Sequence, residues 1–149
     1  IGTIIKHIPG HGLAKKDSHL KLPYINNKLS YLKTNDFSTF KNKKSIFAMT
    51  AHIVFKALDK NDCITHSKNG IKYIRNNINF KNLIISDDIS MKALQYSFNQ
   101  NVKKAYEAGC NLVLHCNGNF KEMNKLAAIA PKIDRFIIEK TSEFYKLLS

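Results

Sequence analysis

A short segment at residues 4–19 decides how this chain folds, and it reads IIKHIPGHGLAKKDSH. Apolar Ile4 and Ile5 indicate a short buried strand, and the proline and glycines that follow indicate a loop. Gly10 and Gly12 allow the backbone of that loop to fold back over a ligand. The segment therefore predicts a strand that delivers titratable side chains to a loop at its carboxyl end.

The same order of features, an apolar run and then polar residues and a helix, recurs along the 149 residues. Strands are expected at 2–7, 45–49, 83–85 and 111–115. Helices are expected at 27–42, 68–78 and 90–108, with two more in 120–148 that break near Pro131. The connection 53–66 is expected to be a long loop.

These continuously apolar strands favour a parallel sheet in an α/β protein. Every polar cluster follows the carboxyl end of a strand, which is where (β/α)8 barrels place their sites. Four units are half of such a barrel, because a whole one typically needs ~250 residues. The fold class expected is therefore α/β, as a partial TIM-type barrel in one domain, residues 1–149.

Composition sets the broad class of the protein. Hydrophobic residues make up 44% and charged residues 23%, as in ordinary globular chains. No run approaches the ~20 apolar residues of a membrane span, so no membrane partner is expected. The three cysteines suggest free thiols in a reducing compartment. The abrupt start at Ile1, without a methionine, suggests a partial chain.

The net charge of +13 raises nucleic acid as a partner. The lysines are scattered, however, and no RNP-like, helix-turn-helix or zinc-finger pattern accompanies them. Drift in composition explains the charge more simply, so nucleic-acid binding is not expected.

Two pairs of residues carry candidate chemistry. Asp17 and His19 are two apart, so in an extended loop both side chains lie on one side. A carboxylate beside an imidazole raises its basicity and fixes its tautomer, as a general acid/base requires. Asp87 and Asp88 end an apolar strand, and alternation sends one into the site and the other into the scaffold. Capping of the following helix by these acids is the structural alternative.

The segment at 6–19 closely resembles the signature KH(F/I)PGHG-x4-DSH of the bacterial β-N-acetylhexosaminidases of glycoside hydrolase family 3. Three further matches follow in the order of that family: MTAH at 49–52, ISDDISM at 85–91 and AGCNLVL at 108–114. The resemblance extends from Gly2 to about Gly118. It implies that the chain corresponds to strands five to eight of the family's catalytic barrel.

The resemblance also implies a mechanism. Asp87 matches the nucleophile, and His19 matches a general acid/base that Asp17 orients. Most retaining glycosidases use two carboxylates, whereas this branch replaces the second with an Asp–His pair. An unperturbed imidazole titrates near ~6.5, so it can donate and accept a proton near neutrality. The expected reaction is retaining hydrolysis of terminal β-linked N-acetylglucosamine, without a metal or organic cofactor.

Four further residues are candidates for binding the substrate. Lys6 and His7 match family positions that hydrogen-bond sugar hydroxyls. Met91 matches the family's methionine after the nucleophile and would pack beside the sugar, although ordinary core packing is almost as plausible. His52 ends the second strand, where it either lines the site or supports it from behind.

Family context points to a cytoplasmic enzyme that recycles cell-wall muropeptides. The expected partners are an N-acetylglucosaminyl glycan and a separate amino-terminal half-barrel. Two alternatives stay open: a non-catalytic remnant that binds sugar without turnover and, less favoured, a basic nucleic-acid-binding module.

Overall fold

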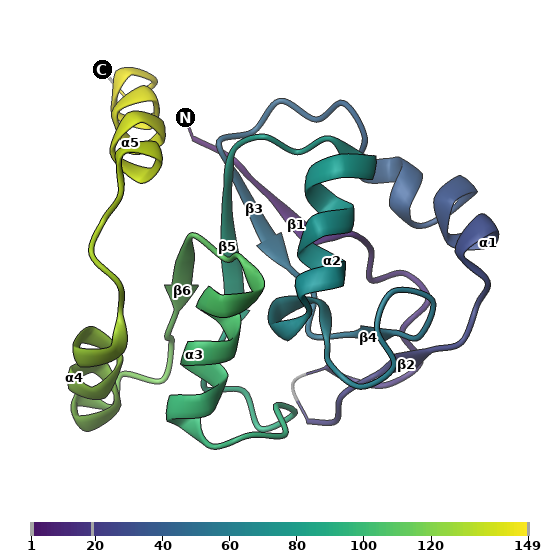
Figure 1. Ribbon diagram of the computed structural model, residues 1–149, viewed down its shortest axis with the longest axis horizontal. Helices are drawn as coiled ribbons and strands as arrows, with labels where there is room; N and C mark the ends of the chain where they lie inside the picture. Colours follow the sequence, from purple (N-terminus) through teal and green to yellow (C-terminus); the bar gives the residue numbers. More distant parts are fainter. Residues whose placement is uncertain (1, 19, 149) are drawn as a thin grey trace.

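The computed structural model describes residues 2–18 and 20–148, and its centre is a four-stranded sheet (Figure 1). The strands are β1 (Ile4–Ile8), β3 (Phe47–Thr50), β5 (Leu83–Asp88) and β6 (Leu112–Leu114). All neighbouring pairs are parallel, and the order in the sheet, β1-β3-β5-β6, follows the sequence. The predicted α/β class with a parallel sheet is confirmed.

Helices connect and follow these strands. After β1 come α1 (Leu29–Thr34) and the short 3₁₀ helix η1 (Phe37–Phe40). After β3 come the 3₁₀ turn η2 (Ile64–His66), α2 (Lys68–Tyr73) and its π-helical continuation η3 (Ile74–Ile78). The remaining helices are α3 (Phe98–Ala108), α4 (Phe120–Ile129) and α5 (Arg135–Lys146). The predicted break between two carboxyl-terminal helices is confirmed.

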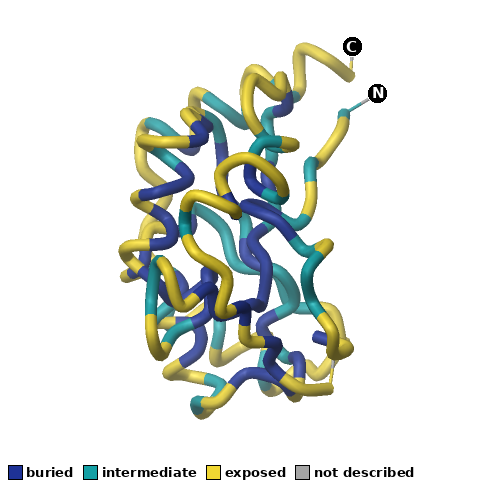
Figure 2. The backbone as a smooth tube through the Cα atoms, turned by 90° about the vertical axis from the view of Figure 1, so that its right-hand side faces the viewer, coloured by how far each residue is buried: buried dark blue, intermediate teal, exposed yellow. Residues whose placement is uncertain are grey.

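The two faces of the sheet have different surroundings. Ala48 and Ile84, paired across β3 and β5, are fully buried in the core, which α2 and α3 complete on one side. On the other face, the row Ile4, Phe47 and Leu83 is covered unevenly, since Ile4 is 40% exposed and only Leu83 is fully buried. Figure 2 shows buried stretches of the chain in the interior of the molecule and exposed stretches mainly toward its periphery. One face therefore packs as a core, while the other is partly open.

The end of α5 returns to the start of the first strand. The ring of Phe144 packs edge-on against Phe47 at a centroid distance of 5.0 Å. A Cβ at Gly2 would collide with the same ring, so the backbone there passes directly over it. This contact covers part of the open face at the amino-terminal end of the sheet.

Two expectations about helices are wrong in detail. The helix expected from residue 90 begins only at Phe98, because Ser97 and Gln100 form a capping box there. It ends as expected before Gly109, whose φ of +113° suits glycine. The helix expected at 27–42 is interrupted at Asn35, whose side-chain amide donates to the carbonyl oxygen of Tyr31.

The connection 53–66 is also more regular than expected. It contains β4 (Val54–Phe55), which pairs in parallel with β2 (Tyr24–Ile25) as a second, two-stranded sheet. Fully buried Ile53, Val54 and Ile64 anchor this connection in the core. Within the described parts of the chain, no helix combines the length and apolar character needed to cross a membrane.

Candidate active site

The imidazole of His7 and the carboxylate of Asp87 meet at the carboxyl end of the sheet. His7 Nε2 lies 3.5 Å from Asp87 Oδ2, although β3 separates their strands. Both side chains are partly accessible, with 26% and 16% of their surfaces exposed. The separation exceeds the usual hydrogen-bond range of about 2.7–3.2 Å, so the pair is open rather than tightly bonded.

Irregularities in strand register occur at both His7 and Asp87. Between Lys6 and Ile8, β1 advances two residues while β3 advances one, and His7 is the extra residue. Between Ile85 and Asp88, β5 advances three residues while β6 advances two. Such irregularities bend a strand and redirect a side chain, and they are common beside active sites.

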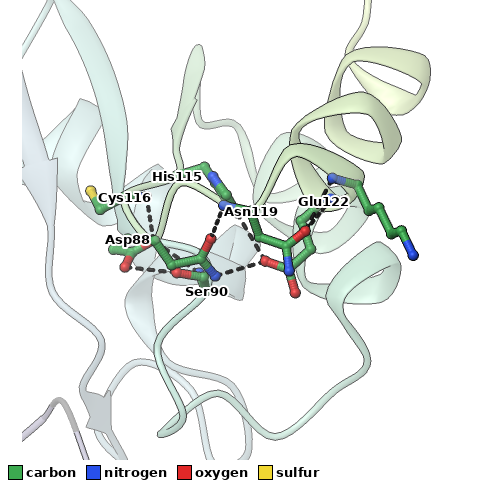
Figure 3. Close-up of polar contacts among 8 residues, drawn as sticks. Asp88, Ser90, His115, Cys116, Asn119 and Glu122 are labelled. Atoms are coloured by element: carbon green, nitrogen blue, oxygen red, sulfur yellow. Dashed lines mark hydrogen bonds and ion pairs between the residues drawn. The ribbon is translucent and has the colours of Figure 1, made fainter.

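Asp88 points into the scaffold, as the predicted division of labour between Asp87 and Asp88 requires. Its Oδ1 accepts hydrogen bonds from the Ser90 backbone N–H at 3.0 Å, the Ser90 hydroxyl at 2.8 Å and the Cys116 backbone N–H at 3.1 Å (Figure 3). The carboxylate therefore ties the loop after β5 to the loop after β6. It does not cap a helix, because α3 begins ten residues later.

His52 supports this corner from behind. It is 1% exposed, and its Nε2 lies 3.0 Å from the carbonyl oxygen of Asp88. Since a carbonyl only accepts, Nε2 carries the hydrogen, and a neutral ring then accepts at Nδ1 from the Thr65 hydroxyl, 2.7 Å away. Thr65 in turn lies 2.8 Å from the hydroxyl of Thr50. With both ring nitrogens engaged by the protein, His52 occupies the supporting position rather than the predicted sugar-binding one.

We call the loop at residues 9–18, which carries Gly10 and Gly12, the glycine loop. Contacts of His11 hold this loop together. Its Nε2 lies 3.1 Å from the hydroxyl of buried Ser18, and its ring lies 5.2 Å from that of His7. At the end of the loop, the carbonyl oxygen of Asp17 accepts the backbone N–H groups of Leu20 and Lys21. The predicted acid/base His19 lies outside the described residues, and its pairing with Asp17 stays a prediction.

The other two predicted binding residues differ in exposure. The side chain of Lys6 is exposed, and its positive charge is one cause that lowers the pKa of His7. Met91 is 8% exposed, and its backbone N–H donates to the Asp88 carbonyl oxygen at 3.2 Å. Met91 thus shares one acceptor with His52 and closes the turn after β5.

Burial is the largest influence on the pKa of His7, and it lowers that pKa below the usual 6.5. The charge of Asp87 acts in the opposite direction, while the positive charge of Lys6 adds to the lowering. His7 is therefore uncharged at neutral pH and can both donate and accept a hydrogen bond. A partly exposed carboxylate beside a neutral imidazole suits a polyhydroxylated ligand and a nucleophilic attack at its carbon.

A second histidine–carboxylate pair closes the loop after β6. His115 Nε2 lies 2.9 Å from Glu122 Oε2, and Glu122 also accepts from the side-chain amide of Asn117 (Figure 3). The hydrogen bond from His115 is the main cause that lowers the pKa of Glu122. Asn119 caps α4 by accepting the backbone N–H groups of its first turn.

The sequence analysis singled out neither Thr65 nor Glu122. Thr65 belongs to a connection without periodic pattern, and Glu122 looks like an ordinary surface acid at the start of a helix. Among the residues that the structure describes, no group of three or more side chains is arranged to hold a metal ion.

The family model described as the glycosyl hydrolase family 3 N terminal domain matches residues 1–141. The chain belongs to this family. Its members are glycosidases, and the β-hexosaminidase of Photobacterium profundum is 30% identical over 158 residues, covering 99% of this chain and 47% of that protein. The predicted family is therefore confirmed.

Solved structures of family 3 proteins share the fold. The β-N-acetylglucosaminidase from Paenibacillus sp. str. FPU-7 matches with a TM-score of 0.82 and 25% identity, over 96% of this chain and 30% of that one. NagZ from Neisseria gonorrhoeae, in complex with N-trifluoroacetyl-D-glucosamine, matches with a TM-score of 0.80 and 27% identity, over 95% and 41%. The chain thus spans less than half the length of these relatives, and its four strands are consistent with part of a family 3 barrel.

Proposed function

We propose that this chain carries the catalytic half of a retaining β-N-acetylhexosaminidase. The observation that carries the proposal is the carboxylate of Asp87, which is partly exposed at the carboxyl end of β5 and faces His7. Membership of a glycosidase family, with a relative named β-hexosaminidase, supports the reaction class. The N-acylated glucosamine bound by NagZ supports the class of sugar.

In the proposed mechanism, Asp87 attacks the anomeric carbon of a terminal N-acetylglucosamine and a glycosyl–aspartyl ester forms. His19 donates its proton to the departing glycosidic oxygen, whose bond to the anomeric carbon breaks. His19 then takes a proton from water, and the hydroxide released breaks the ester with retention of configuration. Asp17 orients His19 throughout. No metal or organic cofactor takes part.

Binding of the sugar falls to the residues around Asp87. Lys6 and His7 hydrogen-bond its hydroxyls, and Met91 packs against it. His52 acts through the Asp88 carbonyl oxygen rather than on the sugar itself, because its two nitrogens are engaged within the protein.

The open face of the sheet supports a partner of matching architecture. Ile4 is 40% exposed there, and Phe47, Met49 and Ile85 are only partly buried. A second half-barrel, in the same protein or supplied separately, would cover this apolar face and complete the sugar pocket. We further propose that the complete enzyme acts in the cytoplasm on muropeptide-derived glycans.

The test uses the intact protein, or this chain co-expressed with an amino-terminal family 3 half-barrel. A fluorinated N-acetylglucosaminide that deglycosylates slowly should add one sugar mass to the peptide containing Asp87, and Asp87→Asn should abolish this labelling. Turnover of an aryl N-acetylglucosaminide with no adduct, unaffected by Asp87→Asn, would contradict the proposal.

The half-open sheet also favours one alternative, a module that binds sugar without turnover. That alternative predicts saturable binding of N-acetylglucosamine with no release of the aryl group. Any turnover that depends on Asp87 eliminates it.

A further inference from the structure

The side chain of Asp36 lies against the glycine loop from a distant part of the sequence. A Cβ added at Gly10 would lie 2.7 Å from Asp36 Oδ1 and even closer to its Cγ and Oδ2. No side chain fits there without displacing the carboxylate, so Gly10 is required by close approach. At Gly12 an added Cβ would meet Oδ1 at 3.5 Å, which is an ordinary contact.

This carboxylate is held in an unusual environment. Its Oδ2 is buried and has no hydrogen-bond partner within residues 2–18 and 20–148. Burial raises the pKa of Asp36, while the backbone N–H of Gly12 and the charge of His11 oppose that shift. Burying an unpaired carboxylate oxygen is costly, so this oxygen does not itself stabilise the fold.

Helix capping does not explain the position of the Asp36 carboxylate. Asp36 stands at the N-cap position of η1, yet its side chain makes no cap hydrogen bond. The helix is instead anchored by the next residue, Phe37, which is fully buried and packs edge-on against Phe55 at 5.0 Å. The buried Phe37 therefore fixes the start of η1, and the side chain of Asp36 points from there toward the glycine loop.

We propose that Asp36 is a positioning residue that fixes the glycine loop and, through it, the segment carrying the acid/base. The connection runs from the carboxylate to Gly10 and Gly12, then through the contact between His11 and Ser18. Ser18 stands directly between the two residues of the proposed acid/base pair in the sequence. The inference about catalysis rests on the proposed function, whereas the inference about the loop does not.

The loop is tested by amide hydrogen exchange of residues 10–18 in the intact protein. Gly10→Ala should accelerate this exchange about tenfold or more, because it expels the carboxylate. Gly12→Ala is the matched control and should have little effect. Asp36→Ala should also accelerate exchange, and Gly10→Ala should add almost nothing in its presence, because both changes break one contact.

Two outcomes would overturn the role in the loop: equal effects of the two glycine substitutions, or additive effects of Gly10→Ala and Asp36→Ala. If Asp36→Ala does not fold, Asp36→Ser takes its place in the comparison of single and double variants, because it also removes the carboxylate. Because this readout needs no turnover, it separates failure of the inference from failure of the proposed function.

The catalytic consequence is tested with two substrates on the same variants. A poor alkoxide leaving group needs the proton of the acid, whereas 4-nitrophenolate hardly does. Asp36→Ala should therefore lower kcat about tenfold more for an alkyl N-acetylglucosaminide than for the 4-nitrophenyl one, with similar KM values. Equal losses on the two substrates would show that Asp36 does not act through the acid/base.

Discussion

Two histidine–carboxylate pairs stand at carboxyl ends of strands in the same sheet, and they are built differently. His115 and Glu122 are 2.9 Å apart, and the histidine is 6% exposed with the ring of Phe98 edge-on at 5.7 Å. His7 and Asp87 are 3.5 Å apart and the histidine is 26% exposed, whereas the carboxylates of both pairs are partly exposed. The first carboxylate also accepts from Asn117, whereas Asp87 Oδ1 accepts from the adjacent backbone N–H of Asp88.

The difference separates a pair that is hydrogen-bonded within the protein from a pair whose carboxylate is less fully engaged. A carboxylate oxygen that already accepts two hydrogen bonds within the protein has less capacity left for a ligand. Asp87 keeps an oxygen that faces a distant, uncharged imidazole, so it can approach an electrophilic carbon. The family resemblance singled out His7 and Asp87 in the sequence, whereas nothing in the sequence singled out Glu122.

The largest effect that this comparison predicts is on turnover. In the intact protein, Asp87→Asn should lower kcat/KM for an aryl N-acetylglucosaminide by at least about 10³-fold, because it removes the proposed nucleophile. Glu122→Gln makes the same chemical change in the other pair and should keep kcat/KM within about tenfold. Equal losses in the two variants would erase the distinction between the pairs.

The second prediction concerns the support beneath the open pair. Thr65→Val keeps the side-chain volume but removes the hydroxyl that lies 2.7 Å from His52 Nδ1. The free energy of unfolding should fall by about 1–3 kcal/mol, since a buried imidazole nitrogen loses its partner.

Thr141→Val on α5 is the matched control for that change. Its hydroxyl donates to the Ile137 carbonyl oxygen at 2.8 Å on a partly exposed helix, so the loss should stay below about 1 kcal/mol. Urea denaturation of both variants measures the difference. A Thr65→Val protein as stable as the control would show that the open pair needs no hydrogen-bonded support.

The sequence predicted the features that depend on local pattern. Apolar runs located all four strands of the main sheet, because buried strand positions favour apolar residues. Gly109 located the end of α3, because a left-handed backbone favours glycine. The resemblance over residues 6–19 and 85–91 identified the family and the pair of aspartates.

Features that depend on contacts between distant segments were not predictable. The pairing of β2 with β4 joins two-residue strands that are too short to show a period. Nothing near Asp36 in the sequence indicates Gly10, which lies 26 residues earlier, and the contact exists only because η1 packs beneath the loop. The register shift that exposes His7 likewise arises from pairing with β3.

The third prediction tests the pair of His115 and Glu122 by varying the pH. The pKa of Glu122 is below its usual 4.5 because His115 and Asn117 donate to the carboxylate. A lowered folded-state pKa stabilises the protein above the unfolded value and loses that stabilisation as the pH falls through the folded value. Glu122→Gln should therefore cost about 1 kcal/mol at pH 7 and less at pH 3.

Denaturation of the wild type and Glu122→Gln at both pH values measures this loss. A cost that is unchanged at pH 3 would mean that packing, rather than charge, holds the loop after β6. The pair would then no longer be a counterpart to the one at Asp87.

The smallest effect is expected from the open pair itself. Burial lowers the pKa of His7 below 6.5, so beneath that pH the unfolded chain binds more protons than the folded one, and stability falls as the pH falls. His7→Gln removes this contribution and should flatten the acid side of the stability profile by less than about 1 kcal/mol. Asp87→Asn should steepen the acid side, because the charge of Asp87 opposes the lowering of the His7 pKa. If both variants changed the slope in the same direction, His7 and Asp87 would not be electrostatically coupled, and the open pair would be only a coincidence of two strand ends.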